Sequence, residues 1–186
     1  MDDALVTAPA EDALLERVDA ALSALIAHDD WLPPACAQAD ATRYRQYLLH
    51  VDAAARYSVV SFVWGPGQGT PIHNHTVWGL IGVLRGAELC TEYAAPGAGV
   101  PVRRRQHRLE RGTIDRVSPT IGDWHAVHNA LTEAPSISIH VYGANIGAVR
   151  RATFAPDGAR KTFISGYSNA LLPNLWDRSG EKEASA

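Results

Sequence analysis

Two histidines separated by one residue, His73 and His75, have a spacing that suggests metal chemistry. They lie in the segment Pro71-Ile-His-Asn-His-Thr-Val-Trp-Gly79, which leads into an apolar run. If this segment is a β-strand, side chains alternate between its two faces, and both imidazoles point the same way. Two imidazoles on one face provide half of a transition-metal site. The sequence therefore predicts a metal centre that takes a further ligand from elsewhere in the chain.

A second cluster, Asp123-Trp-His125-Ala-Val-His128-Asn129, offers that further ligand. We favour His125, because it follows the turn signal Pro119-Thr-Ile-Gly122, whereas His128 would point to the opposite face of a regular strand. The other candidates are His28, His50, His107 and His140. Ligation by three imidazoles suits zinc, copper, iron or nickel, so the ligands alone leave the metal open. A zinc hydrolase and a redox enzyme are both compatible with this ligand set.

The elements that must position these histidines are predominantly short strands. Residues 10–28 have apolar residues at helical spacing and predict one amphipathic helix. From Tyr57 onward, the β-branched or alternating segments 57–64, 77–84, 87–93 and 135–142 are separated by glycine, proline and asparagine. Residues 42–49 are compatible with a second helix or with the start of a strand. This pattern is typical of a mainly β sandwich or barrel.

The length of 186 residues favours a single domain covering residues 1–186. We expect an N-terminal helical segment over about residues 10–50, a β-barrel over about 56–165 and a flexible C-terminal tail over about 179–186.

Composition and charge exclude several classes of function. A net charge of −3 gives no electrostatic reason to expect nucleic acid as a partner. No apolar run is long enough to span a membrane, and the acidic N-terminus has no signal-peptide pattern. Cys36 and Cys90 are the only cysteines, and their separation matches neither a zinc knuckle nor a redox pair. We expect a cytoplasmic protein with unpaired thiols, either a monomer or a weak homo-oligomer.

The two histidine clusters resemble the paired motifs of the cupin superfamily. In the first motif, Gly67, His73, His75 and Gly86 occupy the family positions, but Gly79 replaces the usual glutamate. In the second motif, Gly112, Pro119, Gly122, His125 and Asn129 match, with one-residue departures around the proline. The resemblance implies a double-stranded β-helix, or jelly-roll, barrel with N-terminal helices. The missing carboxylate implies a neutral site of three histidines.

Within the cupins, the chain resembles the thiol dioxygenases over roughly residues 40 to 175. These are cysteine dioxygenase and its bacterial relative, 3-mercaptopropionate dioxygenase, and the segment around His73 is similar to the bacterial form. Ser138, His140 and Tyr142 match a Ser-His-Tyr relay that lies beside the iron in this family. Alternation along a strand places all three on one face, so the spacing also permits a hydrogen-bonded chain.

The same resemblance informs substrate recognition. In animal cysteine dioxygenases a cysteine crosslinks to the relay tyrosine, but Gly79 stands at that position here. The arginine that holds the substrate carboxylate in the cysteine-type enzymes is replaced by Gln46, as in the 3-mercaptopropionate type. Arg151 then fits the role of carboxylate partner, because guanidinium binds carboxylate through two parallel hydrogen bonds. Arg45 competes for this role, although its side chain would point elsewhere on a regular strand.

The resemblance implies a mononuclear enzyme with one Fe(II) per chain, held by His73, His75 and His125. It would insert both atoms of O2 into the sulfur of a small thiol carboxylate, giving a sulfinate, with 3-mercaptopropionate favoured and cysteine as the alternative substrate. Tyr142, His140 and Ser138 would be catalytic, and Arg151 and Gln46 would bind substrate. A metal-binding cupin that acts as a sensor without catalysis is the alternative from another class. A three-histidine isomerase or a quercetinase-like oxygenase is a further enzymatic alternative.

Overall fold

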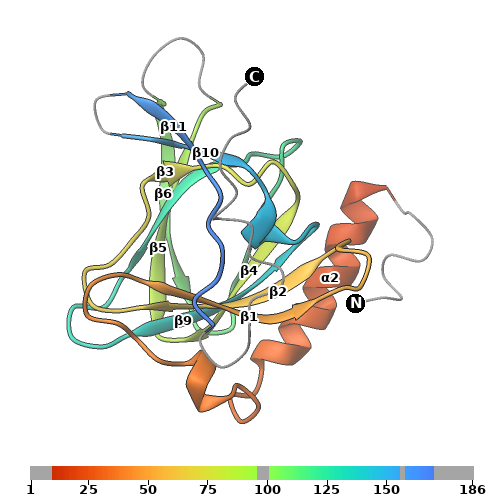
Figure 1. The fold of residues 1–186 in the computed structure, drawn as a ribbon, viewed down its shortest axis with the longest axis vertical. Helices are drawn as coiled ribbons and strands as arrows, with labels where there is room; N and C mark the ends of the chain where they lie inside the picture. Colours follow the sequence, from red (N-terminus) through yellow and green to blue (C-terminus); the bar gives the residue numbers. More distant parts are fainter. Residues whose placement is uncertain (1–9, 96–100, 156–157, 170–186) are drawn as a thin grey trace.

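The computed structural model describes residues 10–95, 101–155 and 158–169. Two antiparallel sheets face each other, and the one long helix among the described residues lies on the outside of one of them (Figure 1). The first sheet has the order β1 (Arg45–Val51), β2 (Ser58–Trp64), β9 (Ser136–Tyr142), β4 (Gly79–Arg85) and β7 (Ile114–Val117). The second has the order β11 (Arg160–Phe163), β10 (Arg151–Phe154), β3 (Ile72–His73), β8 (Trp124–Asn129), β5 (Ala87–Tyr93) and β6 (Arg103–Glu110).

This architecture confirms the fold class predicted from the sequence, a mainly β double-stranded β-helix preceded by a helix. Helix α2 (Glu11–Ile26) lies within the predicted helical range, and β2, β4, β5 and β9 overlap the four predicted strands. Two short 3₁₀ helices, η1 (Pro34–Cys36) and η2 (Ile146–Ala148), complete the described elements. Among the described helices, none combines the length and apolar character that crossing a membrane requires.

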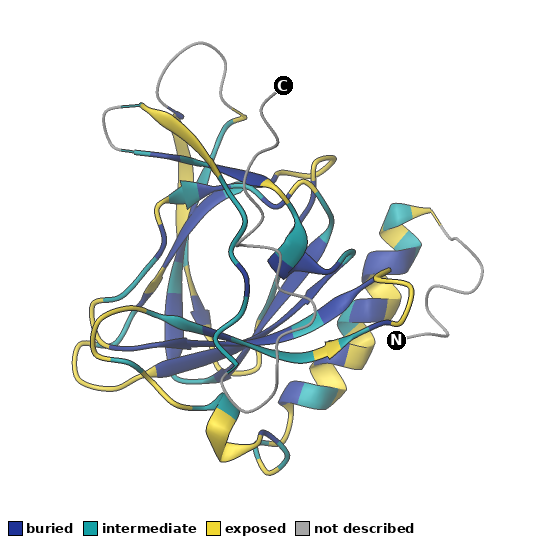
Figure 2. Cartoon of the chain, viewed as in Figure 1, coloured by how far each residue is buried: buried dark blue, intermediate teal, exposed yellow. Residues whose placement is uncertain are grey.

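Strand β9 is buried on both faces and connects the two parts of the core (Figure 2). Ile137, Ile139 and Val141 belong to a cluster with apolar residues of α2, which packs on β4, β7 and β9. Because successive side chains alternate, the intervening residues of β9 point into the barrel, where Tyr142 belongs to the second apolar cluster. Helix packing on one face thus fixes the strand that carries the polar residues on the other face.

The first sheet begins earlier than predicted. Residues 42–49 contribute a strand, β1, which starts at Arg45, so the sheet does not begin near residue 56 and the helical segment does not extend to residue 50. Among the described strands β1 pairs with β2 alone, Ser168 and Asn169 hydrogen-bond to its backbone, and most of its side chains are half-buried. An edge strand of this kind lacks the clear alternation that identifies a strand in sequence. The tail predicted over residues 179–186 lies outside the described residues.

Candidate metal centre and its cavity

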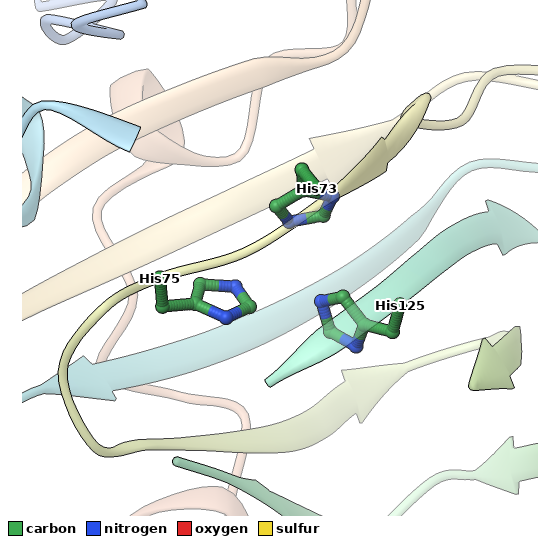
Figure 3. Close-up of side chains that lie close together, drawn as sticks. All are labelled: His73, His75 and His125. Atoms are coloured by element: carbon green, nitrogen blue, oxygen red, sulfur yellow. The ribbon is translucent and has the colours of Figure 1, made fainter. Parts of the chain in front are cut away.

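Three histidines from two segments far apart in the sequence converge inside the barrel. His73 on β3 and His125 on β8 are cross-strand partners, and His75 lies just beyond the end of β3. The ring centroids are 4.9 Å apart for His73 and His75, 4.7 Å for His73 and His125, and 4.9 Å for His75 and His125. One nitrogen from each ring lies within 4.8 Å of the others, and Figure 3 shows the rings turned toward a common space. The structure therefore brings together the three predicted ligands.

A partner on the outer side orients each of these rings. The Nδ1 of His75 is 2.8 Å from Oδ1 of Asp123, and the Nδ1 of His73 is 3.1 Å from the carbonyl oxygen of Pro71. The Nδ1 of His125 lies 3.6 Å from Sγ of Cys90. When Nδ1–H donates outward, the Nε2 lone pair faces the common space, which is the arrangement found at histidine metal sites. Nε2 of His75 is buried and has no hydrogen-bond partner, which fits the role of a metal ligand.

Asp123 explains why His75 faces the centre although β3 ends at His73. Besides the ring of His75, its carboxylate accepts hydrogen bonds from the backbone N–H of His75 at 2.9 Å and of Thr76 at 2.8 Å. Thr76 has a φ of 62°, which turns the chain out of the strand. Both imidazoles face the same space, as they would on one face of a strand, but β3 ends at His73 and the condition of a continuous strand is not met. A carboxylate, and not strand alternation, holds the second ring.

Burial keeps these imidazoles uncharged. Desolvation lowers the pKa of His73 and His75 well below the ordinary value, and neighbouring histidines lower it further. Desolvation and His73 lower the pKa of His125 to about 3. Neutral imidazole is the form that coordinates a metal, so the donor set fits a divalent transition ion without prior loss of protons.

A hydrogen-bonded chain runs along the inner face of β9. Oγ of Ser138 is 2.7 Å from Nε2 of His140, and Nδ1 of His140 is 2.8 Å from the hydroxyl oxygen of Tyr142. The ring of Phe62 stacks on His140 with centroids 4.1 Å apart, and desolvation lowers the pKa of His140 well below its usual value. The structure brings together the three residues of the predicted relay, with a neutral histidine in the middle.

Tyr142 connects this chain to the metal centre. Its ring stacks on that of His75, with centroids 5.3 Å apart. Burial raises the pKa of the Tyr142 hydroxyl, with Arg151 opposing that rise, so the group is a neutral phenol at neutral pH. Tyr142 lines the same cavity as His73 and His125.

That cavity has a volume of about 170 Å³, which suits a ligand of a few heavy atoms. Arg151 lines it and is 5% exposed, with Nη2 2.6 Å from Oγ of Ser165 and its guanidinium carbon 4.7 Å from the ring centre of Phe163. Its Nε has no hydrogen-bond partner, and no ion pair to Arg151 occurs among the described residues. Burial lowers the pKa of Arg151, but guanidinium stays charged in proteins. The cavity thus contains a cation suited to an anionic ligand.

Gln46 also lines the cavity and is buried, and its side-chain amide donates to the carbonyl oxygen of Gly166. Arg45, the competing candidate, lies outside this cavity and pairs with Asp40. His128 is exposed, in agreement with the expectation that it faces away from His125.

Several contributors to the site were missed by sequence reasoning. Tyr44 lines the cavity, and its ring is tilted against that of Trp64 with centroids 4.8 Å apart. Asp123 stands two residues before His125, and an acidic residue so close to a ligand was the available signal for its role. Cys90 contacts His125, and no spacing rule in the sequence indicates this contact.

Comparison with known proteins agrees with this geometry. Residues 16–153 match the family model for cysteine dioxygenase type I. A curated relative, cysteine dioxygenase type 1 of Danio rerio, is 24% identical over 157 residues, covering 82% of this chain and 72% of the relative.

Solved structures with similar folds include an uncharacterized protein with a double-stranded β-helix domain from Klebsiella pneumoniae. It is 16% identical with a TM-score of 0.47, and the match covers 72% of this chain and 97% of that one. A cupin superfamily protein from Desulfitobacterium hafniense is 14% identical with a TM-score of 0.46, and the match covers 63% and 93% of the two chains.

Proposed function

The chain belongs to the cysteine dioxygenase type I family, and from this membership we propose that it is an Fe(II)-dependent thiol dioxygenase. The reaction joins a thiol and O2 to give a sulfinic acid, R–SH + O2 → R–SO2H, so both oxygen atoms end on sulfur and no external electron donor is needed. The observation that supports this proposal most strongly is the group of three buried, neutral histidines. They lie beside a tyrosine relay and an arginine that has no ion pair among the described residues.

We propose that one iron is held by His73, His75 and His125, whose inward nitrogens lie close together. Iron held by these residues would supply a Lewis acid that lowers the pKa of the substrate thiol. Asp123, the carbonyl of Pro71 and Cys90 keep the three rings in the orientation that binding requires.

The protein's own side chains position the substrate. The guanidinium of Arg151 binds the substrate carboxylate, and Phe163 and Ser165 hold the guanidinium in place. Tyr142 lines the same cavity and offers its hydroxyl hydrogen to the reacting atoms, while His140 accepts or donates at the other side of that oxygen. Aromatic side chains around the cavity exclude water from the reaction.

We propose 3-mercaptopropionate as the favoured substrate. Gln46 cannot form an ion pair with a carboxylate, and Arg151 is the cation that lines the cavity among the described residues. Among the described residues that line the cavity there is no carboxylate to pair with the amino group of cysteine, which favours a thiol carboxylate without that group. Cysteine as main substrate is the second candidate, which the Danio rerio relative favours by its name. A small thiol and O2 would be the only partners, with the protein active in the cytoplasm as a monomer or weak homo-oligomer.

An oxygen-electrode assay of the Fe(II)-loaded protein tests this function. The thiols 3-mercaptopropionate, cysteine and cysteamine are supplied in turn, and the sulfinate is quantified against the O2 consumed. We expect one sulfinate per O2, with 3-mercaptopropionate giving the highest kcat/KM. Iron binding without thiol-dependent O2 consumption would instead indicate a metal-binding protein that is not an enzyme.

A further inference from the structure

Glu88 is a fully buried carboxyl group that the proposed reaction does not use. It lies on β5, is 0% exposed, and neither of its oxygens has a partner at hydrogen-bonding geometry. The side chains of Ser138, Ser136 and Trp64 face it and act on its pKa as hydrogen-bonding neighbours. The hydroxyl of Ser136 is likewise buried and without a partner. Burying a carboxyl group without hydrogen bonds costs free energy. The position of Glu88 at the end of the relay therefore needs an explanation.

The bonding capacity of Ser138 connects this carboxyl to the relay. A serine hydroxyl has one hydrogen to donate and two lone pairs that accept. Trp64, which can only donate, occupies one lone pair through its Nε1–H at 3.2 Å. One hydrogen and one lone pair are then shared between His140 and Glu88. If Ser138 donates to one of these neighbours, it must accept from the other.

We propose that Glu88 is a positioning residue that extends the Ser138–His140–Tyr142 chain and sets the direction of its hydrogen bonds. A protonated Glu88 donates to Ser138, which donates to Nε2 of His140. The proton of neutral His140 is then on Nδ1 and is donated to the oxygen of Tyr142, so the phenolic hydrogen is directed into the cavity.

Loss of the Glu88 proton to solvent reverses every bond in the chain. Ser138 then donates to the carboxylate and accepts from Nε2–H of His140, whose Nδ1 accepts the hydrogen of Tyr142. The oxygen of Tyr142 then presents a lone pair to the cavity, and its hydroxyl hydrogen no longer points there. This inference rests on the proposed function only for its consequence, which is that Tyr142 assists the reaction as a donor.

The surroundings of Glu88 keep it protonated at neutral pH. Burial raises its pKa to about 8, against the smaller opposing effects of Ser138, Ser136 and Trp64. No charged side chain among the described residues contributes to that shift. Glu88 also adds a small part to the rise in the pKa of Tyr142. Glu88 is surrounded by side chains on its own strand, β5, and on β8, β6, β9 and β2. The residues that face it or are linked to it through the hydrogen-bonded chain are Cys90, Asn129, Leu109, Ser136, Ser138, His140, Tyr142 and Trp64.

The tautomer of His140 provides a direct test that does not depend on activity. The full-length chain is loaded with diamagnetic Zn2+, and the ¹⁵N shifts of the His140 ring are followed as pH is raised through about 8. We expect the proton to move from Nδ1 to Nε2 in the wild type, and to remain on Nδ1 throughout in Glu88→Gln, whose amide donates at every pH. A wild-type tautomer that does not change over this range, or a Glu88→Gln protein that titrates like the wild type, would overturn the proposal.

Kinetics of the iron enzyme test the consequence. With saturating thiol, wild-type kcat is expected to fall as pH rises through about 8, whereas Glu88→Gln keeps a flat profile there. Glu88→Leu, which has no donor, is expected to lose about tenfold in kcat at neutral pH, and Gln is expected to restore most of that loss. Ionisation of the free thiol affects all three proteins equally. An identical decline in the wild type and Glu88→Gln would contradict the inference, whereas an inactive wild type with the expected change in tautomer would reject only the proposed function.

Discussion

The ring of Tyr142 packs directly against the backbone of Gly79, its cross-strand partner on β4. A Cβ atom at Gly79 would lie 2.7 Å from Cδ1 and 2.8 Å from Cε1 of that ring, closer than real Cβ contacts. Any side chain at position 79 would therefore collide with the ring of Tyr142. The hydroxyl of Tyr142 is positioned by close packing and by His140, without a covalent link.

Gly79→Ala should therefore displace the Tyr142 ring and lower kcat by about tenfold, equivalent to about 1.4 kcal/mol of transition-state stabilisation. Metal content should not change relative to the wild type, because Gly79 touches none of the three histidines among its nearest contacts. The matched control is the same change in a Tyr142→Phe background, where no hydroxyl remains to be misplaced. Equal losses in the two backgrounds would mean that the effect does not act through the hydroxyl.

Tyr142→Phe removes the hydroxyl and leaves the ring against Gly79 and His75. We expect kcat to fall by about tenfold or more, with iron affinity unchanged, because the hydroxyl contributes to the reaction and not to the ligand set. Tyr47→Phe is the control, since its hydroxyl donates to the carbonyl of Gln38 outside the cavity. Normal turnover by Tyr142→Phe would remove the relay from the mechanism.

The carboxylate clamp can be tested on two kinds of substrate. Arg151→Lys keeps the charge but loses the paired donors, and we expect KM for 3-mercaptopropionate to rise by about tenfold or more. Cysteamine has no carboxylate, so its KM should hardly change. Arg150→Lys is the matched control, because Arg150 is the exposed neighbour and does not line the cavity. A similar rise for both thiols would argue against a clamp.

Asp123 is expected to control metal affinity more than turnover. Asp123→Asn keeps the shape of the side chain but replaces one acceptor oxygen with an amide nitrogen, which is a donor. That nitrogen would face another donor, either Nδ1–H of His75 or the backbone N–H of Thr76. Loss of such an orienting partner typically weakens metal binding by about 10–100-fold. Competition with a chelator measures this, with Asp19→Asn as control because Asp19 pairs with Arg116 at the surface. An unchanged affinity would show that His75 needs no partner.

The sequence was sufficient for the parts of this site that follow from regular alternation. Ser138, His140 and Tyr142 share a face because β9 is an unbroken strand. The other strands with long apolar segments were also predictable, because they too are regular. Asp123 had only its closeness to His125 in the sequence as a signal, and Glu88 had none, because both roles depend on contacts between segments far apart in the chain. The edge strand β1 was ambiguous because its half-buried side chains carry little periodic signal. Tertiary contacts, and not local pattern, decide such positions.

The buried histidines also make the stability of the metal-free protein depend on pH. Burial lowers the pKa of His73, His75, His125 and His140, so these groups stay neutral in the folded chain below the unfolded value of about 6.5. The unfolded chain then binds more protons, and each group removes up to about 1.4 kcal/mol of stability per pH unit as pH falls through this window. Their stabilising effect is fully present above the unfolded value and is lost on acidification.

Glu88 has the opposite sign, because its pKa is raised to about 8 in the folded chain. Its contribution is present below the unfolded pKa and is lost as pH rises toward about 8, so it offsets about one histidine in the acidic window. We therefore expect the urea midpoint of the metal-free protein to fall steeply as pH is lowered below about 6.5, and more steeply in Glu88→Gln, which lacks the opposing group. A midpoint that stays constant over this window would mean that the histidines take up protons without unfolding, and that the barrel admits water to the site.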